Sequence, residues 1–212
     1  MSQNTIISLV VFTCGAVVMS FEILGSRVLA PNFGSSVFVW GSLISVFLAG
    51  LSAGYYFGSR LADINPSSRK LGIMIIVPGV LFLSFPLYSP PISDWIFMKD
   101  LGVRISPLLA STALFLLPSV FLGIVSPYTA KLMICSLHTS GKTIGTLYAL
   151  STFGSIIGTL LTSFYLITVA GVNALIMAQG AILVAIAIPL LFMGLQCKIG
   201  QPEAALKEGK AE

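Results

Sequence analysis

The chain has 212 residues, of which 56% are hydrophobic and only 8% are charged, and its mean hydropathy is +1.01. This composition excludes a soluble domain, and no nucleic-acid partner is expected. The formal net charge of +4 is uninformative as a sum and useful only in how the charged residues are distributed. Runs of about twenty apolar residues are long enough to cross a bilayer. Dividing the chain at its polar clusters predicts six transmembrane spans: Ile6–Ala30, Ser36–Gly58, Leu71–Tyr88, Pro107–Met133, Ile144–Val169 and Val172–Leu195.

The predicted fold class is therefore an all-α integral membrane protein with six transmembrane helices. The membrane domain covers residues 1–195, and the polar segment 196–212 reads as a cytoplasmic tail or the remainder of a linker. Between the third and fourth spans, the connector Ser89–Ser106 predicts a short helix in the membrane interface, with Trp95 as its anchor.

Glu22 is the most informative residue of the first span. Its place in the sequence puts it about 24 Å into an apolar core of about 30 Å. A carboxylate at that depth is costly unless it faces protein or water, so Glu22 is a candidate for binding a cation or moving a proton. Its helical neighbours at spacings of three, four and seven form a face of mostly small side chains: Gly15, Val18, Met19, Gly25 and Ser26. The alternative is a carboxylate that only fixes the packing through a hydrogen bond.

Residues of other spans could complete a site around Glu22. Trp40 in the second span, and Tyr148 and Ser151 in the fifth, supply aromatic and hydroxyl groups, and we predict them as substrate-binding candidates together with Glu22. Arg27 is awkwardly placed for a direct pair with Glu22 within one helix. It is expected to reach the outer interface or to meet another helix.

Small residues mark one face of the second span and one face of the fifth. Gly50, Gly54 and Gly58 are spaced four apart, as are Gly154 and Gly158. This spacing lets helix backbones approach closely in lipid, and packing is the simplest interpretation. Two alternatives stay open: these faces could slide in a protein that changes shape, or they could pair two copies of the chain in a homo-oligomer.

The basic residues predict the topology, because Lys and Arg collect on the cytoplasmic side of membrane proteins. With six spans, both termini share one side, and most Lys and Arg fall there. We therefore expect a protein of the cytoplasmic (inner) membrane with both termini in the cytoplasm. The basic residues on the side of the termini are Arg60, Arg69, Lys70, Lys131, Lys142, Lys198, Lys207 and Lys210; those on the other side are Arg27, Lys99 and Arg104.

Metal and disulfide chemistry are not expected. The cysteines Cys14, Cys135 and Cys197 fall in or near the cytoplasmic half, where thiols stay reduced, and the lone His138 lies in a polar connector. We predict no metal site and no cofactor.

Six spans with both ends on one side divide into two groups of three, and the second group must enter the membrane from the opposite face. Any internal repeat would therefore be inverted. The proline-bearing polar stretches Arg27–Pro31 and Ser126–Lys131 give weak support to such a repeat. Inverted repeats are the plan of many secondary transporters, with a site near the repeat interface.

Several segments together carry a family resemblance. The stretches are Glu22–Ser36, Trp40–Ser42, Gly54–Gly58, Arg60–Asp63, Ser126–Pro127 and Gly145–Thr159. They resemble the membrane domain of the spermidine synthase-like (polyamine aminopropyltransferase-like) proteins, a region itself likened to half of a major facilitator transporter. The resemblance implies a cytoplasmic aminopropyltransferase domain after the membrane region. No such domain is present in the 212 residues, so we expect no enzyme activity from this chain alone.

Two functions are compatible with these features. In the first, the chain is a transporter-type module for a small cation such as a polyamine, in which Glu22 neutralises an ammonium group. Arg27, Arg60, Asp63 and Lys131 would then serve gating or structural roles. In the second, the helices are a membrane anchor or platform for an aminopropyltransferase domain or protein in the cytoplasm.

Overall fold

The computed structural model describes residues 3–64, 66–137 and 140–194, and every regular element in these residues is a helix. The tail 196–212, Cys197 and His138 lie outside the described residues. The helices are α1 (Gln3–Phe33), α2 (Val37–Asp63), α3 (Ser68–Leu83), α4 (Phe85–Met98), α5 (Gly102–Leu137), α6 (Ser140–Leu161), the π-helical segment η1 (Thr162–Leu166), α7 (Ile167–Val169) and α8 (Val172–Phe192).

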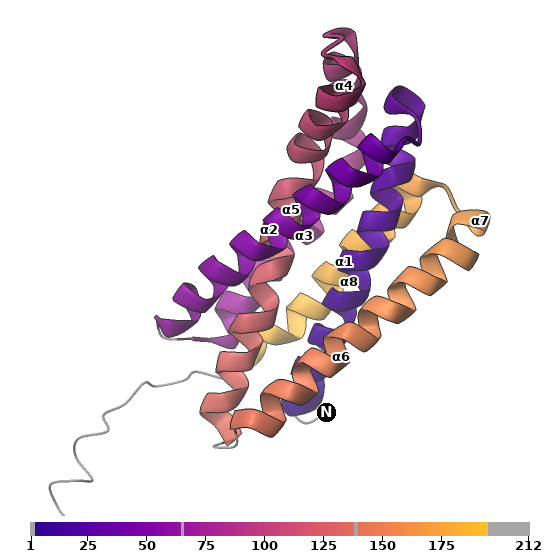
Figure 1. Ribbon diagram of the computed structural model, residues 1–212. Helices are drawn as coiled ribbons and strands as arrows, with labels where there is room; N and C mark the ends of the chain where they lie inside the picture. The colour runs from indigo at the N-terminus through magenta and orange to yellow at the C-terminus, as the bar shows by residue number, and fades with distance from the viewer. Residues whose placement is uncertain (1–2, 65, 138–139, 195–212) are drawn as a thin grey trace, which may run out of the picture.

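The helices confirm a multi-pass membrane protein in contact with a lipid bilayer. In the described chain, five helical stretches are long and apolar enough to cross a membrane by themselves, and the bent pair of α3 and α4 makes a sixth if the two form one span. The start of α1 and the end of α8 lie at the same end of the bundle (Figure 1). We call this the N-terminal end, and the end that holds α4 and the α1–α2 connection the distal end.

The predicted third span, Leu71–Tyr88, is not one continuous helix. It is broken at Ser84, where α3 and α4 meet with a bend of 63°. Pro86 explains the break: it has no N–H to bond the carbonyl of Phe82, and its ring would clash with that carbonyl in a straight helix. The predicted interfacial helix around Trp95 is therefore the second half of α4, which begins at Phe85.

The packing pairs helices from the two halves of the chain. The most extensive contacts join α2 to α5, α1 to α6 and α3 to α8. In order along the chain, α1, α2 and α3 are the spans of the first half, and α5, α6 and α8 are the corresponding spans of the second half. If each span is replaced by its counterpart, the α2–α5 contact becomes the α6–α1 contact, and the α3–α8 contact stays the same. This is the contact pattern that two inverted repeats of three spans would give.

The α2–α5 contact is built on glycine. A Cβ added to Gly54 would overlap the carbonyl oxygen of Val120 and lie 2.8 Å from the Cα of Gly123. A Cβ on Gly50 would lie 2.6 Å from the Cβ of Ser119. Gly58, one turn further along α2, is buried in the same contact. The glycine face of the second span therefore lies directly against the backbone of α5.

The α1–α6 contact uses glycine in the same way. A Cβ on Gly154 would overlap the carbonyl oxygen of Phe12, and a Cβ on Gly158 would overlap that of Ala16. In both halves of the chain, the middle span thus presents glycines to the first span of the other half.

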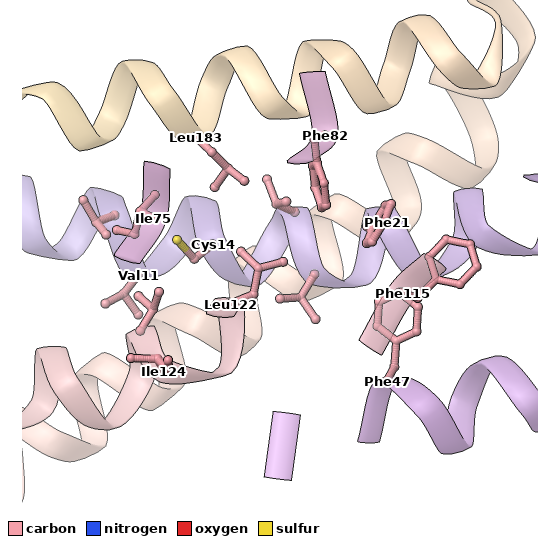
Figure 2. Packing of buried hydrophobic residues seen from close by; sticks show 14 of the residues in the cluster. Val11, Cys14, Phe21, Phe47, Ile75, Phe82, Phe115, Leu122, Ile124 and Leu183 are labelled. Carbon is pink, nitrogen blue, oxygen red and sulfur yellow. The ribbon is translucent and has the colours of Figure 1, made fainter. Parts of the chain in front are cut away.

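An aromatic cluster fills the centre of the bundle. The ring of Phe21 lies 4.1 Å from that of Phe82, 5.2 Å from Phe115 and 5.6 Å from Phe47, measured between centroids. Figure 2 shows Phe21 on α1 with these rings around it, which come from α2, α3 and α5. Because aromatic rings in such contacts add to the free energy of burial, this cluster fixes α1 against three other helices.

Tyr128 holds the connection between α2 and α3. Its side chain is fully buried, and its hydroxyl accepts a hydrogen bond from the backbone N–H of Ser67 at 2.9 Å and donates to the carbonyl of the same residue at 3.2 Å. Ser67 in turn caps α3, since its side chain accepts from the N–H of Arg69. One phenol from α5 thus fixes the start of α3.

Replacing Tyr128 by phenylalanine should lower the free energy of unfolding by about 1–3 kcal/mol, because the buried N–H of Ser67 would lose its partner. Thermal unfolding of the purified protein in detergent measures the change. Tyr165→Phe is the control, because Tyr165 is 59% exposed. Equal unfolding temperatures for the two variants would contradict this role of Tyr128.

Candidate functional site

A cavity of about 200 Å³ lies between α1, α2, α5 and α6. Its lining is mostly apolar but includes two phenols, from Tyr55 and Tyr148, and several hydroxyls on α5 and α6. Such groups can accept hydrogen bonds from an ammonium group, and the phenol rings can also face a cation. The lining residues are Cys14, Gly15, Val18, Met19, Leu51, Tyr55, Leu122, Ser126, Tyr148, Ser151, Thr152 and Ser155. We call it the central cavity.

Two of the predicted binding residues meet in the central cavity. Tyr148 and Ser151 both line it from α6. Trp40 does not join them: it lines a separate cavity of about 320 Å³ near the distal end, together with Arg27, Ser26 and Ser163. Tyr55 and Ser126 line the central cavity but were not predicted, because the sequence does not show which faces of α2 and α5 meet α6.

Glu22 lies between the two cavities. Gly15, Met19, Glu22 and Ser26 form one stripe along α1, at helical spacings of three and four. Gly15 and Met19 line the central cavity, whereas Ser26 lines the 320 Å³ cavity that also contains Trp40. Glu22 therefore occupies the stretch of this stripe that separates them.

The facing helix α6 and its continuation repeat this arrangement. Ser151 and Ser155 line the central cavity, and Ser163 lines the 320 Å³ cavity. The two cavities therefore lie along one contact between α1, α2 and the α6–η1 segment, with the Glu22 carboxylate between them. We call this contact the seam.

The carboxylate of Glu22 is half-buried and has no hydrogen bond or ion pair with any residue in the described ranges. The structure therefore does not show the hydrogen bond that a purely packing role would need. An uncompensated carboxylate at membrane depth is costly, and a bound cation or proton would remove that cost.

At the N-terminal end, Asp63 and Lys131 join α2 to α5. The Lys131 Nζ lies 2.8 Å from the Asp63 Oδ1. Arg60, which was predicted with Asp63 and Lys131 to have a gating or structural role, lies apart from this pair, and its guanidinium is 4.4 Å from the centroid of the Tyr56 ring. The pair is solvent-exposed and adds little to the free energy of folding. It links α2 and α5, which both line the central cavity.

The sequence reading missed a buried polar cluster between α1, η1 and α8. The Ser20 and Thr162 hydroxyls are 2.5 Å apart, and the Gln179 Nε2 donates to the Ser20 Oγ at 2.6 Å. Gln179 stands in a highly apolar span, which was the available signal. Hydrogen bonds of this kind hold helices together in lipid, here next to a π-helical segment that often marks a functional region.

The described residues contain no group of three or more His, Cys, Asp or Glu side chains placed to hold a metal ion. Cys14 is a free, buried thiol beside the central cavity. The side chain of Cys135 is not among those described.

No protein-family model, curated protein or solved structure matches this chain. Any functional conclusion therefore depends on the residues and geometry described above.

Proposed function

We propose that this chain is a transmembrane module of the spermidine synthase-like type that moves a small organic cation, such as a polyamine, across the cytoplasmic membrane. The observation that carries the proposal is the seam: two cavities along α1, each with several hydroxyl-bearing side chains in its lining, with the uncompensated Glu22 between them. Transport sites of membrane proteins commonly lie between repeats of this kind, near the middle of the bilayer.

The chemistry of the seam suits a primary ammonium group. Such a group donates three hydrogen bonds, and the central cavity offers acceptors from Tyr55, Ser126, Tyr148, Ser151 and Ser155. Glu22 would supply the negative charge that compensates the ammonium in the apolar surroundings. The choice of a polyamine among small cations rests on the sequence resemblance.

The ion pair at the N-terminal end fits a gate on this route. Lys131 and Asp63 join α2 and α5 on the side where most Lys and Arg of the chain are found, which the charge rule makes the cytoplasmic side. Opening the pair would free the ends of α2 and α5 on this side, whereas the glycine contact at Gly54 would still hold the middle of the two helices together. Both termini would then face the cytoplasm.

The test is uptake of labelled putrescine and spermidine into proteoliposomes, compared with empty liposomes. Saturable uptake by the intact chain is expected. Thr152→Phe should block it, because Thr152 lines the central cavity and a ring there would fill the cavity.

Thr146→Phe is the matched control for this block. Thr146 lies on the same helix and makes the same type of hydrogen bond to the carbonyl four residues earlier, but lines none of the cavities described. Uptake no greater than in empty liposomes, by a folded and inserted protein, would overturn the transport proposal and favour the alternative of a membrane platform for a cytoplasmic aminopropyltransferase.

A further inference from the structure

A third cavity, of about 470 Å³, lies at the distal end between the end of α1, the face of α4 and the start of α8. It combines a cationic side chain, a carboxylate and two serines. The residues that carry the argument are Arg27, Asn32, Ser89, Ser93, Asp94 and the α8 start at Gly171–Asn173. We call it the distal pocket.

One part of the distal pocket favours an anion. Arg27 lines it with a guanidinium group that can bind two oxygens of a phosphate or carboxylate. Gly171, the N-cap of α8, also lines it, as do Val172 and Asn173 in the first turn of that helix. The helix has 21 residues, and its N-terminus has no side-chain cap. The unbonded N–H groups of such a turn carry partial positive charge and bind anions.

Another part favours a cation. Asp94 lines the pocket from α4, and its Oδ1 accepts a hydrogen bond from the Asn32 Nδ2 at 2.8 Å. This bond fixes the orientation of the carboxylate. Within the described chain, no ion pair within 4.0 Å joins Asp94 to Arg27, so neither charge is neutralised by the other.

Two buried serines give an independent indication of a ligand. Ser89 and Ser93 are each 4% exposed, lie one turn apart on α4 and line the pocket. Neither hydroxyl has a hydrogen-bond partner among the residues that the structure describes, and neither belongs to the described polar atoms that are enclosed without a partner, so both are open to the pocket. A hydroxyl that bonds no protein group and faces a pocket is left to bond water or a ligand, and these two offer a polar molecule two hydrogen bonds one turn apart.

We infer that the distal pocket binds a small zwitterion, with a phosphate or carboxylate at Arg27 and the start of α8 and an ammonium group at Asp94. Ser89 and Ser93 supply hydrogen bonds between the two charged ends. The same chemistry is found in a phosphoethanolamine lipid headgroup and in a free soluble zwitterion. The pocket shares Arg27 with the 320 Å³ cavity of the seam, whereas Asp94, Ser89 and Ser93 line the distal pocket and not that cavity. Binding of a zwitterion here does not depend on transport.

Two measurements test this site and separate the two sources. In the first, phosphoethanolamine is titrated by calorimetry into the delipidated full chain in an uncharged detergent. In the second, native mass spectrometry measures retention of phosphatidylethanolamine against phosphatidylglycerol by the full chain released from mixed-lipid nanodiscs. Binding in the first measurement indicates a soluble ligand, and selective retention in the second alone indicates the lipid headgroup; either supports the site.

The variants are Arg27→Gln and Asp94→Asn, each expected to weaken binding by about tenfold, the effect of removing one charge-assisted hydrogen bond. Asp94→Asn should leave binding of inorganic phosphate unchanged, since phosphate carries no ammonium group. The matched controls are Arg104→Gln and Asp100→Asn, which remove like charges near the distal end but outside this pocket.

Ser93→Ala, a change too small to unfold the chain, provides a further variant if Arg27→Gln does not fold, and it should also weaken binding. Absence of binding in both measurements would overturn the inference, and so would equal losses in the pocket variants and the controls.

Discussion

Glu22→Gln should reduce saturable putrescine uptake by about tenfold to a hundredfold while the protein stays folded. Removing the partner of a bound ammonium group costs about 1.5–3 kcal/mol, which corresponds to that range. Glutamine keeps the shape of the side chain and loses only the charge. Since the Glu22 carboxylate has no partner within the described chain, its replacement breaks no hydrogen bond or ion pair seen there.

The same variant separates the transport role from a packing role. If Glu22 only held the helices together, Glu22→Gln would lower the thermal stability and affect uptake through loss of folded protein. The transport role requires an unfolding temperature close to that of the native chain. Glu22→Asp, which keeps the charge on a shorter side chain, should retain part of the uptake, and Asp100→Asn should leave uptake unchanged. Full uptake by Glu22→Gln would rule out its proposed role.

Much of the fold follows from hydropathy, because lipid requires each crossing to be a long apolar helix. The prediction fails at Ser84, where the third span divides into α3 and α4. Averaged hydropathy does not register a single proline, and Pro86 cannot donate a hydrogen bond to the carbonyl of Phe82. Proline alone would not have located the break in advance, however, because α5 continues through Pro118 and Pro127.

The candidate site was less accessible from sequence. Glu22 is conspicuous because a carboxylate in an apolar run is rare, and Tyr148 and Ser151 share a cavity because they are three residues apart on one helix. Trp40 lies elsewhere because convergence between helices depends on which helices are neighbours. The structure shows that α1 packs on α6 and α2 on α5. Helical periodicity in the sequence predicts which face of a helix is in contact, but not which other helix it contacts.

Gly154→Val should strongly destabilise the bundle. Its Cβ would overlap the carbonyl oxygen of Phe12, and backbone atoms of α1 cannot move aside as a flexible side chain can. Overpacking usually costs about 1–3 kcal/mol, and we expect the upper end or more, because here the obstacle is backbone. The same change at Gly158, which faces the carbonyl of Ala16, should behave alike.

The consequence extends to the central cavity. Many α6 side chains are exposed, and its most extensive helix contact is with α1, so forcing the two apart removes the main support of the helix that carries Tyr148 and Ser151. Gly145→Val is the control, since a Cβ at Gly145, on the same helix, would meet nothing within 4 Å. Thermal unfolding and the yield of monodisperse protein in detergent measure the difference. If Gly154→Val were as stable as Gly145→Val, the close α1–α6 contact would be wrong, and with it the wall of the cavity on which the transport proposal rests.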